Sequence, residues 1–267
     1  MSRCAVSVIM GVLYRNKDTS LLRRSIDSLL TQTFADFELL ICDDGSCENA
    51  VRLLDSLAEA DHRIRLLRPG DRFSLPSKLN YCLSEAKGEL IARMDDDDYS
   101  YPDRLQKQVD YLQAHKEIAF VGCNVRLVYE GQEKGKREFP QRPQVRDFYM
   151  TQPYIHPTLV FRIDALKAVG GYSEDPHQNL CEDYDLLLRL YEKGFSGANF
   201  PEILFDYTVR ADAKDNRKLS HRWNEVVTRY QRFRALGVLP KSLPYVIKPV
   251  IVGLLPSGLV SRLKNKR

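Results

Sequence analysis

Acidic side chains gather at three places in this 267-residue chain, and carboxylates are the groups that hard divalent cations prefer. The three clusters are CDDGS with Asp43 and Asp44, MDDDDY with Asp95, Asp96, Asp97 and Asp98, and CEDYD with Glu182, Asp183 and Asp185. Neighbouring carboxylates repel one another, so a run of four needs a bound cation or water to offset the cost. Mg²⁺ and Mn²⁺ commonly take one or two carboxylates from the protein, and substrate phosphates complete the shell.

The four consecutive aspartates can be interpreted in two ways. Taken alone, the run suits a solvated acidic loop as well as a metal site. Residues i and i+2 of an extended segment point the same way, so a D-x-D pair can share one ion. The apolar stretch before the run and the two other acidic clusters favour the metal site.

Short apolar runs alternate with amphipathic patterns through the first half of the chain. The pattern predicts strands within 5–13, 37–46, 64–68, 89–94 and 118–129, and helices within 20–32, 48–60, 76–88 and 101–115. Repeated strand–helix units of this length predict an α/β fold with a mostly parallel sheet and helices on both faces. The first two acidic clusters follow strands, and ligands of such sheets collect at the carboxyl ends of strands.

The second half of the chain is less regular. It predicts a strand, a short helix and a glycine turn within 156–172, a helix at 181–194, a strand at 202–210 and a helix at 216–237. The tail, 241–267, is apolar, and Pro249 and Pro256 are expected to interrupt it. It holds six basic residues and no acidic one, so the net charge of +4 leaves −2 for residues 1–240. That balance argues against a nucleic-acid-binding protein.

The cysteines and the first residues indicate the compartment. None of the six cysteines forms a CxxC pair, which argues against a structural zinc site, and several lie in apolar runs as buried thiols do. The N-terminal segment lacks a secretory pattern, and no apolar segment reaches the roughly 18 residues of a membrane-spanning helix. We therefore expect a cytoplasmic protein with free thiols.

Five stretches of the chain resemble the inverting family 2 glycosyltransferases in order and spacing as well as in sequence. They are VSVIMGVLYRN, LLRRSIDSLLTQTFADFELLICDDGS, LSEAKGELIARMDDDDYSYPDRLQKQVDYL, HPTLVFRIDALKAVGGY and CEDYDLLLRL, and together they cover residues 5–210. The resemblance implies the GT-A fold, with a catalytic domain over 1–215 and a basic helical extension over 216–267. It assigns nucleotide binding to about 1–98 and acceptor binding to about 99–215.

The resemblance also implies a nucleotide-sugar site built on the first two clusters. Asp43 and Asp44 would contact the nucleoside, and the structural alternative for Asp43 is that it only caps the following turn. Asp95 and Asp97 align with the family's D-x-D motif as ligands of Mn²⁺ or Mg²⁺, which would neutralise the departing diphosphate. Asp95 and Asp96 are in addition candidates for contact with the nucleotide.

Two basic residues, Lys78 and Arg93, are candidates to bind the donor phosphates, although a lysine on a helix surface is usually just solvated. Asp98 is expected to support the run, either by orienting Arg93 or by capping the next helix. Arg210 is a candidate to face the diphosphate, and the mixed segment 211–218 would suit a loop that closes over the donor.

The CEDYD cluster resembles the family's ED motif, which implies a catalytic base. An inverting transfer needs one base to deprotonate the acceptor hydroxyl as it attacks the anomeric carbon. Asp183 is the first candidate and Glu182 the second, against the alternative of acids that favour a helix N-terminus. Asp185 is expected to support the helix. His156 is a candidate for contact with the acceptor or the metal, although a lone histidine before a buried strand is more often structural.

These features predict a metal-dependent inverting glycosyltransferase that moves a hexose or N-acetylhexosamine from a UDP-sugar to a saccharide or lipid-linked saccharide. The implied process is the synthesis of capsule, O-antigen or exopolysaccharide. Two alternatives stay open: a nucleotidyltransferase acting on a sugar phosphate, and a non-catalytic glycan- or membrane-binding module. Residues 245–260 and the basic end suit either a helix on the anionic inner face of the membrane or a helix packed on the domain.

Overall fold

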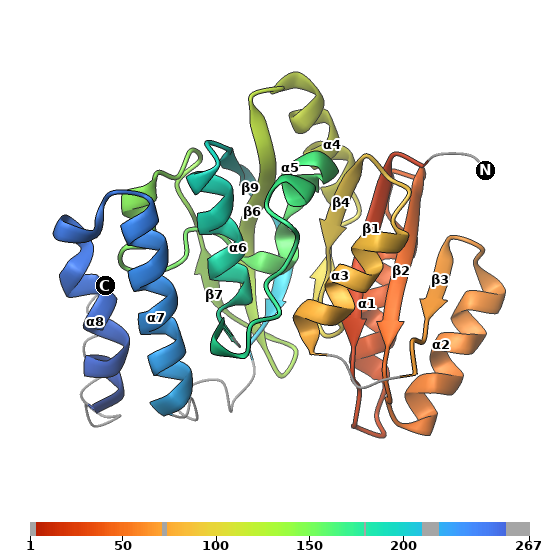
Figure 1. Cartoon of the computed structure of the whole chain (residues 1–267). Helices are drawn as coiled ribbons and strands as arrows, with labels where there is room; N and C mark the ends of the chain where they lie inside the picture. The colour runs from red at the N-terminus through yellow and green to blue at the C-terminus, as the bar shows by residue number, and fades with distance from the viewer. Residues whose placement is uncertain (1–3, 71–73, 179, 210–218, 255–267) are drawn as a thin grey trace.

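A central sheet with helices on both faces organises the chain (Figure 1). The structure is a computed structural model, and it describes residues 4–70, 74–178, 180–209 and 219–254. Within these residues the sheet has nine strands in the order β3-β2-β1-β4-β8-β6-β9-β5, and β7 pairs with β6 outside this path. Figure 1 shows the first half of the chain at one end of the sheet and the C-terminal helices at the other.

The first half forms the parallel part of the sheet, as the sequence predicts. Strands β3, β2, β1 and β4 run parallel to one another, so their carboxyl ends meet at one edge. The elements are β1 (Val6–Val12), α1 (Ser20–Leu30), β2 (Phe37–Asp43), α2 (Glu48–Ala60), β3 (Ile64–Leu67), α3 (Leu75–Glu85) and β4 (Leu90–Arg93). The acidic turns after β2 and β4 therefore share that edge.

The second half continues the same sheet with mixed strand directions. Strand β8 is antiparallel to both β4 and β6, β9 is parallel to β6, and the short β5 is antiparallel to β9. The elements are β5 (Tyr99–Ser100), α4 (Arg104–Ala114), β6 (Ile118–Tyr129), β7 (Gln132–Arg137), η1 (Val145–Phe148), η2 (His156–Thr158), β8 (Val160–Arg162), α5 (Ile163–Ala168), η3 (Pro176–Gln178), α6 (Glu182–Glu192) and β9 (Ser196–Thr208). Strand β9 thereby reaches the end of the aspartate run.

Two predicted boundaries in this half are wrong, and one strand was missed. Strand β9 begins at Ser196 rather than at 202, because its first part pairs with β6 from Ile118 onward. Strand β7 was not predicted, since its sequence QEKGKR is polar and mostly exposed, and only backbone pairing with β6 makes it a strand. Helix α4 begins at Arg104 rather than at 101, after the short strand β5.

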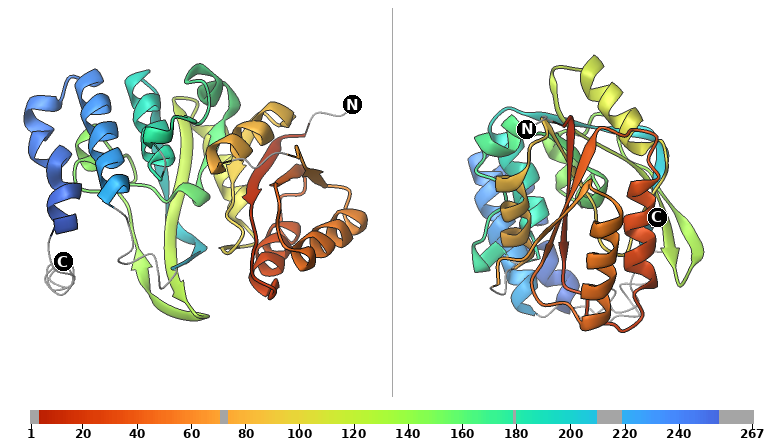
Figure 2. Two further views of the ribbon diagram at one scale, coloured as in Figure 1. Left: turned by 60° about the horizontal axis from the view of Figure 1, so that its bottom comes forward. Right: turned by 90° about the vertical axis from the view of Figure 1, so that its right-hand side faces the viewer.

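Two hydrophobic cores lie on opposite faces of the sheet. Successive side chains of β1 point to opposite faces, so Val8 and Met10 lie in one core and Ile9 lies in the other. The first core includes apolar residues of α1, α2 and α4, and the second includes those of α3, α5 and α6. The right-hand view of Figure 2 shows α3 and α1 on opposite sides of the strands. The strand ends that carry the acidic residues are therefore held rigidly between two layers of helices.

Two C-terminal helices complete the described residues, α7 (Leu219–Ala235) and α8 (Leu239–Leu254), and they pack side by side (Figures 1 and 2). The prediction that Pro249 interrupts the tail is wrong, since both Pro244 and Pro249 lie inside α8. Each proline removes one backbone donor, and packing against α7 supports the helix across these positions. No helix among the described residues has the length and apolarity to cross a bilayer.

Three expectations fall on residues that the structure does not describe. They are the role of Arg210, the closing segment 211–218 and the interruption at Pro256. The expected domain boundary between 215 and 216 also lies there. These expectations stay predictions.

Candidate active site

The carboxyl end of β2 carries the first acidic cluster in a tight turn. Asp43 is buried and accepts a hydrogen bond from the Ser46 amide at 3.1 Å, and Arg68 Nε lies 3.7 Å from its other oxygen. The Ser46 hydroxyl accepts from the Tyr14 amide at 2.8 Å, which ties this turn to the segment after β1. Gly45 has φ of +119°, a left-handed conformation that favours glycine. Asp43 therefore caps its turn, and its contact with a nucleoside stays a prediction.

Lys78 is buried on the inner side of α3, so the interpretation of a solvated surface lysine is wrong. Its Nζ donates to the Val12 carbonyl at 2.7 Å and forms an ion pair with Asp44. Gly11 makes this approach possible, because a Cβ there would lie 3.3 Å from the Lys78 Cβ and 2.9 Å from a Leu75 methyl. Asp44 and Lys78 thus meet at the carboxyl ends of β1 and β2.

Arg93 ends β4 with its guanidinium fully buried. The side chain donates to the Met94 carbonyl and forms an ion pair with Asp95, while its Nε has no hydrogen-bond partner among the described residues. A buried charge is stable only when it is paired or ligated. The pair with Asp95 therefore fixes the first aspartate of the run beside the end of β4.

The four aspartates of the run differ in exposure and support. The side chain of Asp95 is 32% exposed, whereas Asp97 and Asp98 are buried. Asp98 accepts a hydrogen bond from the Thr208 amide at 2.7 Å, and the Thr208 hydroxyl donates to the Asp97 carbonyl at 2.5 Å. Asp98 thus supports the run as expected, but by joining it to the end of β9.

Charge is crowded within this run. Burial, followed by the charges of Asp95 and Asp97, raises the pKa of Asp98 well above its usual range. Asp98 Oδ2 is buried without a hydrogen-bond partner among the described residues. Burial, and then the charges of Asp96, Asp18 and Asp97, raise the pKa of the Tyr14 hydroxyl, which indicates that the segment after β1 lies near the aspartate run. A cation would offset the excess of negative charge.

Asp95 and Asp97 fit a divalent cation shared with a substrate better than one enclosed by the protein. No group of three or more histidine, cysteine, aspartate or glutamate side chains in the described part of the chain is arranged to hold an ion. Mg²⁺ usually binds one or two carboxylates and completes its shell with water and substrate phosphate. The crowded carboxylates and the buried orphan oxygen of Asp98 fit that kind of site.

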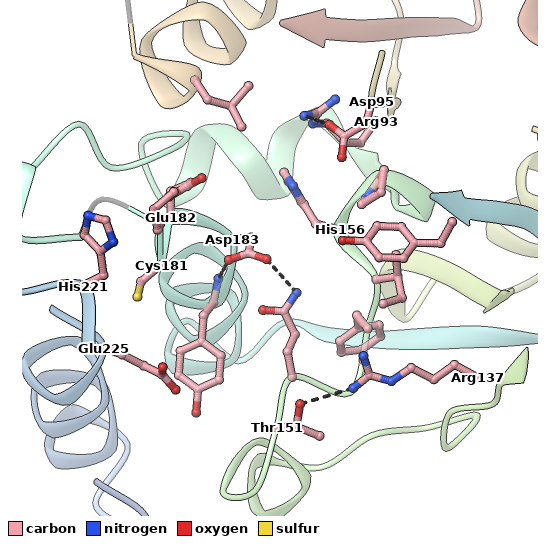
Figure 3. A pocket seen from close by; sticks show the side chains of 18 of the residues that line it. Arg93, Asp95, Arg137, Thr151, His156, Cys181, Glu182, Asp183, His221 and Glu225 are labelled. Atoms are coloured by element: carbon pink, nitrogen blue, oxygen red, sulfur yellow. Dashed lines mark hydrogen bonds and ion pairs between the residues drawn. The ribbon is translucent and has the colours of Figure 1, made fainter. Parts of the chain in front are cut away.

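A pocket of about 670 Å³ brings five of the predicted site residues together (Figure 3). Its lining includes Arg93, Asp95, His156, Glu182 and Asp183. Figure 3 shows Arg93 and Asp95 at one end of the pocket, with His156 and Asp183 nearer its middle. The other predicted site residues do not line it, namely Asp43, Asp44, Lys78, Asp96 and Asp97. The site therefore has two parts, a turn region at the ends of β1 and β2 and this pocket.

Asp183 and Glu182 begin α6, but their surroundings differ. Asp183 accepts hydrogen bonds from the Gln152 amide group at 3.1 Å and from the Tyr184 backbone at 2.7 Å. Burial and then the charge of Asp183 raise the pKa of Glu182 to about 7, and one Glu182 oxygen has no hydrogen-bond partner among the described residues. Asp185 is fully buried and lies 2.6 Å from Arg189, so its expected supporting role is confirmed.

His156 is buried between the pocket and the core. Its Nε2 lies 2.9 Å from the Tyr172 hydroxyl. Burial, and then the positive charge of Arg93, lowers the pKa of His156 well below its usual range. The imidazole is therefore neutral at pH 7, fixed by Tyr172 and open to the pocket on one side.

Comparison with known proteins decides the family. Residues 7–170 match the family model described as Glycosyl transferase family 2. The putative glycosyltransferase EpsE of Bacillus subtilis (strain 168) is 34% identical over 263 residues, which span 98% of this chain and 94% of that protein. The chain belongs to glycosyltransferase family 2. The protein is therefore an enzyme. Its membership of this family favours glycosyl transfer over the two alternatives, a nucleotidyltransferase and a non-catalytic binding module.

Two further relatives of the glycosyltransferase are named for O-antigen biosynthesis and for amylovoran biosynthesis. The O-antigen biosynthesis glycosyltransferase WbnJ of Escherichia coli is 33% identical, with 81% of this chain and 84% of that protein covered. The amylovoran biosynthesis glycosyltransferase AmsE of Erwinia amylovora is 27% identical, with 83% and 82% covered. In all three cases the match covers most of the relative's own length.

Solved structures confirm the predicted GT-A fold of the glycosyltransferase. Staphylococcus aureus TarS 1–349 in complex with UDP-GlcNAc superposes with a TM-score of 0.70 at 16% identity, covering 91% of this chain and 73% of that one. The mannosyltransferase PcManGT of Pyrobaculum calidifontis, in complex with GDP-Man and Mn²⁺, gives 0.64 at 17% identity, covering 99% and 80%. At these identities the likeness concerns the fold alone.

The pocket of the glycosyltransferase also contains residues that the sequence analysis missed. They are Arg137 from β7, Thr151 and Gln152 from the segment before η2, Tyr207 from β9, and His221, Glu225 and Arg229 from α7. None belongs to a recognisable motif, and the irregular segment and α7 reach the pocket only through tertiary packing. The sequence offers one local signal for Thr151 and Gln152, which is that TQPY (151–154) lies just before the HPT stretch (156–158).

Proposed function

We propose that this glycosyltransferase transfers a hexose or N-acetylhexosamine from a UDP-sugar to a saccharide acceptor, with inversion and with a divalent metal. The observation that carries the proposal is one pocket that holds the Arg93–Asp95 pair and the Glu182–Asp183 pair. A donor phosphate site and a base must face the same anomeric carbon for a single displacement. The two pairs come from different elements and meet only in the folded chain.

The donor occupies the carboxyl edge of the parallel strands. Asp43 and Asp44 contact the nucleoside, while Lys78, Arg93, Asp95 and Asp96 lie toward the ribose and the diphosphate. Lys78 already neutralises Asp44, so its role is to hold that carboxylate in place as well as to add positive charge. Solved neighbours with UDP-GlcNAc and with GDP-Man support a nucleotide-sugar donor.

Asp95 and Asp97 would hold the cation, Mn²⁺ or Mg²⁺, and it would share the donor diphosphate with the protein. When bound, the metal neutralises the negative charge that develops on the departing UDP. The structural neighbour PcManGT, which is in complex with GDP-Man and Mn²⁺, supports a divalent ion. Arg93 and Thr208 hold the aspartate run at its two ends, so the carboxylates need not rearrange when the metal and the donor bind.

Asp183 is the base of the transfer. The acceptor oxygen forms a bond to the anomeric carbon as the bond from that carbon to the diphosphate oxygen breaks, and the hydroxyl proton passes to Asp183. Gln152 orients the carboxylate through its amide group. Glu182, with its pKa raised to about 7, is partly protonated at neutral pH and adds less repulsion than an ordinary glutamate would. Attack opposite the leaving group inverts the configuration at the anomeric carbon.

The acceptor is a saccharide or a lipid-linked saccharide of a surface polysaccharide such as capsule, O-antigen or exopolysaccharide. The relatives WbnJ, of O-antigen biosynthesis, and AmsE, of amylovoran biosynthesis, support this assignment. Helix α8 carries an exposed apolar stripe at helical spacing, formed by Leu243, Ile247 and Ile251. This stripe supports a location of the enzyme at the cytoplasmic face of a membrane. The chain from 241 onward carries six basic residues and no acid, which suits an anionic lipid surface.

A screen of nucleotide-sugars tests this proposal. UDP-, GDP- and dTDP-sugars are titrated into the protein with and without Mn²⁺, and slow release of free nucleotide is followed in parallel. We expect binding and slow hydrolysis of a UDP-sugar that depend on Mn²⁺. A protein that binds none of these donors, or that binds GDP-sugars and not UDP-sugars, would contradict the proposal.

A further inference from the structure

Arg137 differs from the other arginines of the pocket in having no carboxylate partner among the residues that the structure describes. Arg93 pairs with Asp95, and Arg229 lies 2.9 Å from Glu225. Arg137 is half-buried on β7, and within the described part of the chain the one hydrogen bond of its side chain goes to the Thr151 hydroxyl at 3.3 Å. A guanidinium carries five N–H donors, so most of those on Arg137 are left for a ligand.

The surroundings of Arg137 hold the guanidinium in place without neutralising it. The central carbon of its guanidinium lies 5.2 Å from the centre of the Phe139 ring, a cation–π contact that helps to hold the group in place. Burial lowers the pKa of Arg137, yet a guanidinium stays protonated in proteins. A charge that is partly removed from water and has no opposite charge nearby destabilises the fold unless a ligand compensates it.

The position of Arg137 assigns that ligand to the acceptor side. Figure 3 shows Arg137 and Thr151 on the side of Asp183 away from Arg93 and Asp95. The donor diphosphate belongs with Asp95, so an anion at Arg137 would be carried by the molecule that Asp183 deprotonates. This step rests on the proposed function. We propose that Arg137, with Thr151, binds an oxyanion of the acceptor and thereby selects acceptors that carry a phosphate or carboxylate group.

A phosphate ester of a lipid-linked acceptor suits this site best. Helix α7 contributes His221, Glu225 and Arg229 to the pocket wall, and α8 packs along α7 with its apolar stripe exposed. Lys248 of α8 donates to the carbonyl of Met150, another lining residue. The pocket thus adjoins the helix that would face lipid, and a diphosphate between saccharide and lipid would lie at that junction. A planar guanidinium binds phosphate oxygens in pairs.

Three synthetic acceptors with the same N-acetylglucosamine unit test the site by isothermal titration. One carries a farnesyl diphosphate, the second a neutral alkyl group, and the third a glucuronate on an alkyl group. We expect wild type to bind the diphosphate probe about tenfold or more tighter than the neutral probe, as hydrogen bonds to charged groups allow. Arg137→Gln should abolish this preference, and Lys136→Gln, an exposed neighbour on the same strand, should retain it.

The outcomes separate the possibilities. An Arg137-dependent preference for the glucuronate probe alone would confirm the oxyanion site but overturn the phosphate assignment. Equal binding of all three probes by wild type, or an unchanged preference in Arg137→Gln, would overturn the site. UDP is titrated into the same samples, so that failure of this site can be told apart from failure of the proposed function. Absence of UDP binding by wild type would contradict the proposed function itself.

A stability measurement guards against a purely structural role for Arg137. Removal of a half-buried unpaired charge should leave the thermal midpoint unchanged or raised. A clear fall of the midpoint in Arg137→Gln would mean that the arginine supports the fold, and the site would then be rejected.

Discussion

At the scale of single residues, hydrogen bonding rather than residue type distinguishes the proposed base from its neighbour. Asp183 and Glu182 both carry carboxylates at the start of α6. Asp183 is oriented by Gln152, whereas Glu182 is more deeply buried and keeps one oxygen without a partner among the described residues. The carboxylate of Asp183 is oriented and accessible, which suits proton transfer. The buried carboxylate of Glu182 suits a role in limiting the negative charge beside Asp183.

Replacement of the proposed base should separate chemistry from binding. In Asp183→Asn the side chain keeps its shape but cannot accept the acceptor proton, so turnover should fall by about 10²- to 10⁴-fold, the usual contribution of a general base. UDP affinity with Mn²⁺ should stay within error of wild type. Steady-state kinetics and UDP titration check both values, with Asp164→Asn on the exposed face of α5 as the control. Wild-type turnover in Asp183→Asn would rule out this base.

Glu182 should make stability depend on pH. Burial and Asp183 raise its pKa from 4.5 to about 7, so the folded state keeps a proton that the unfolded chain loses between these values. That stabilising contribution is present below pH 4.5 and is lost as pH rises through about 7. Relative to Glu182→Gln, the unfolding free energy of wild type should fall across this window by on the order of 2–3 kcal/mol.

Urea unfolding of both proteins at about pH 5 and about pH 8 measures this difference, because effects of all other titrating groups cancel to first order. Parallel pH dependence in the two proteins would show that Glu182 titrates normally in the fold.

At the scale of secondary structure, the strand ends place the acidic clusters. Strands β1, β2 and β4 are parallel and end at one edge, and β9 reaches the aspartate run from the other half of the sheet. Thr208 at the end of β9 donates its amide to Asp98 and its hydroxyl to the carbonyl of Asp97. The run is therefore held by an element more than one hundred residues away in sequence.

Thr208→Val should weaken this connection while keeping the shape of the strand. Loss of one partly buried hydrogen bond should cost about 1 kcal/mol of unfolding free energy, and Mn²⁺-dependent UDP affinity should fall with it. Chemical unfolding and UDP titration measure the two effects. Thr31→Val removes an exposed hydroxyl that bonds within its own helix region, and serves as the control. An unchanged UDP affinity in Thr208→Val would mean that β9 does not position the run.

The sequence predicts the elements well where periodicity is local, and poorly where the site depends on packing. The four parallel strands and the helices between them follow from apolar runs and amphipathic spacing. The burial of Lys78 could not be predicted, because it depends on how closely α3 approaches Gly11. Gln152 and Arg137 come from an irregular segment and a polar strand, and only tertiary structure brings them to Asp183.

At the scale of the whole molecule, the pocket lies between the sheet and the C-terminal helices. Helix α7 lines it, and α8 turns its apolar stripe of Leu243, Ile247 and Ile251 outward, each about half exposed. These three residues recur every four positions and so lie on one side of the helix. A membrane bound there would lie beside the acceptor pocket.

Replacement of the stripe by serine at 243, 247 and 251 should reduce flotation with vesicles that contain anionic phosphatidylglycerol. Exposed apolar residues contribute little to folding, so the thermal midpoint should change little. Leu21→Ser on α1, an equally exposed leucine, is the control. Wild type should float less with neutral phosphatidylcholine vesicles and at high salt. Equal flotation of wild type and the triple variant would reject α8 as the docking helix.

The central claim is that the aspartate run binds a metal ion together with the nucleotide. Its most direct test is titration of UDP into wild type and Asp97→Asn, each with Mn²⁺ and with EDTA, and with Asp164→Asn as control. The account predicts tight UDP binding by wild type and the control only with Mn²⁺, and weak, metal-independent binding by Asp97→Asn. Equal UDP affinity with and without Mn²⁺ in wild type, or an undiminished Mn²⁺ effect in Asp97→Asn, would contradict it.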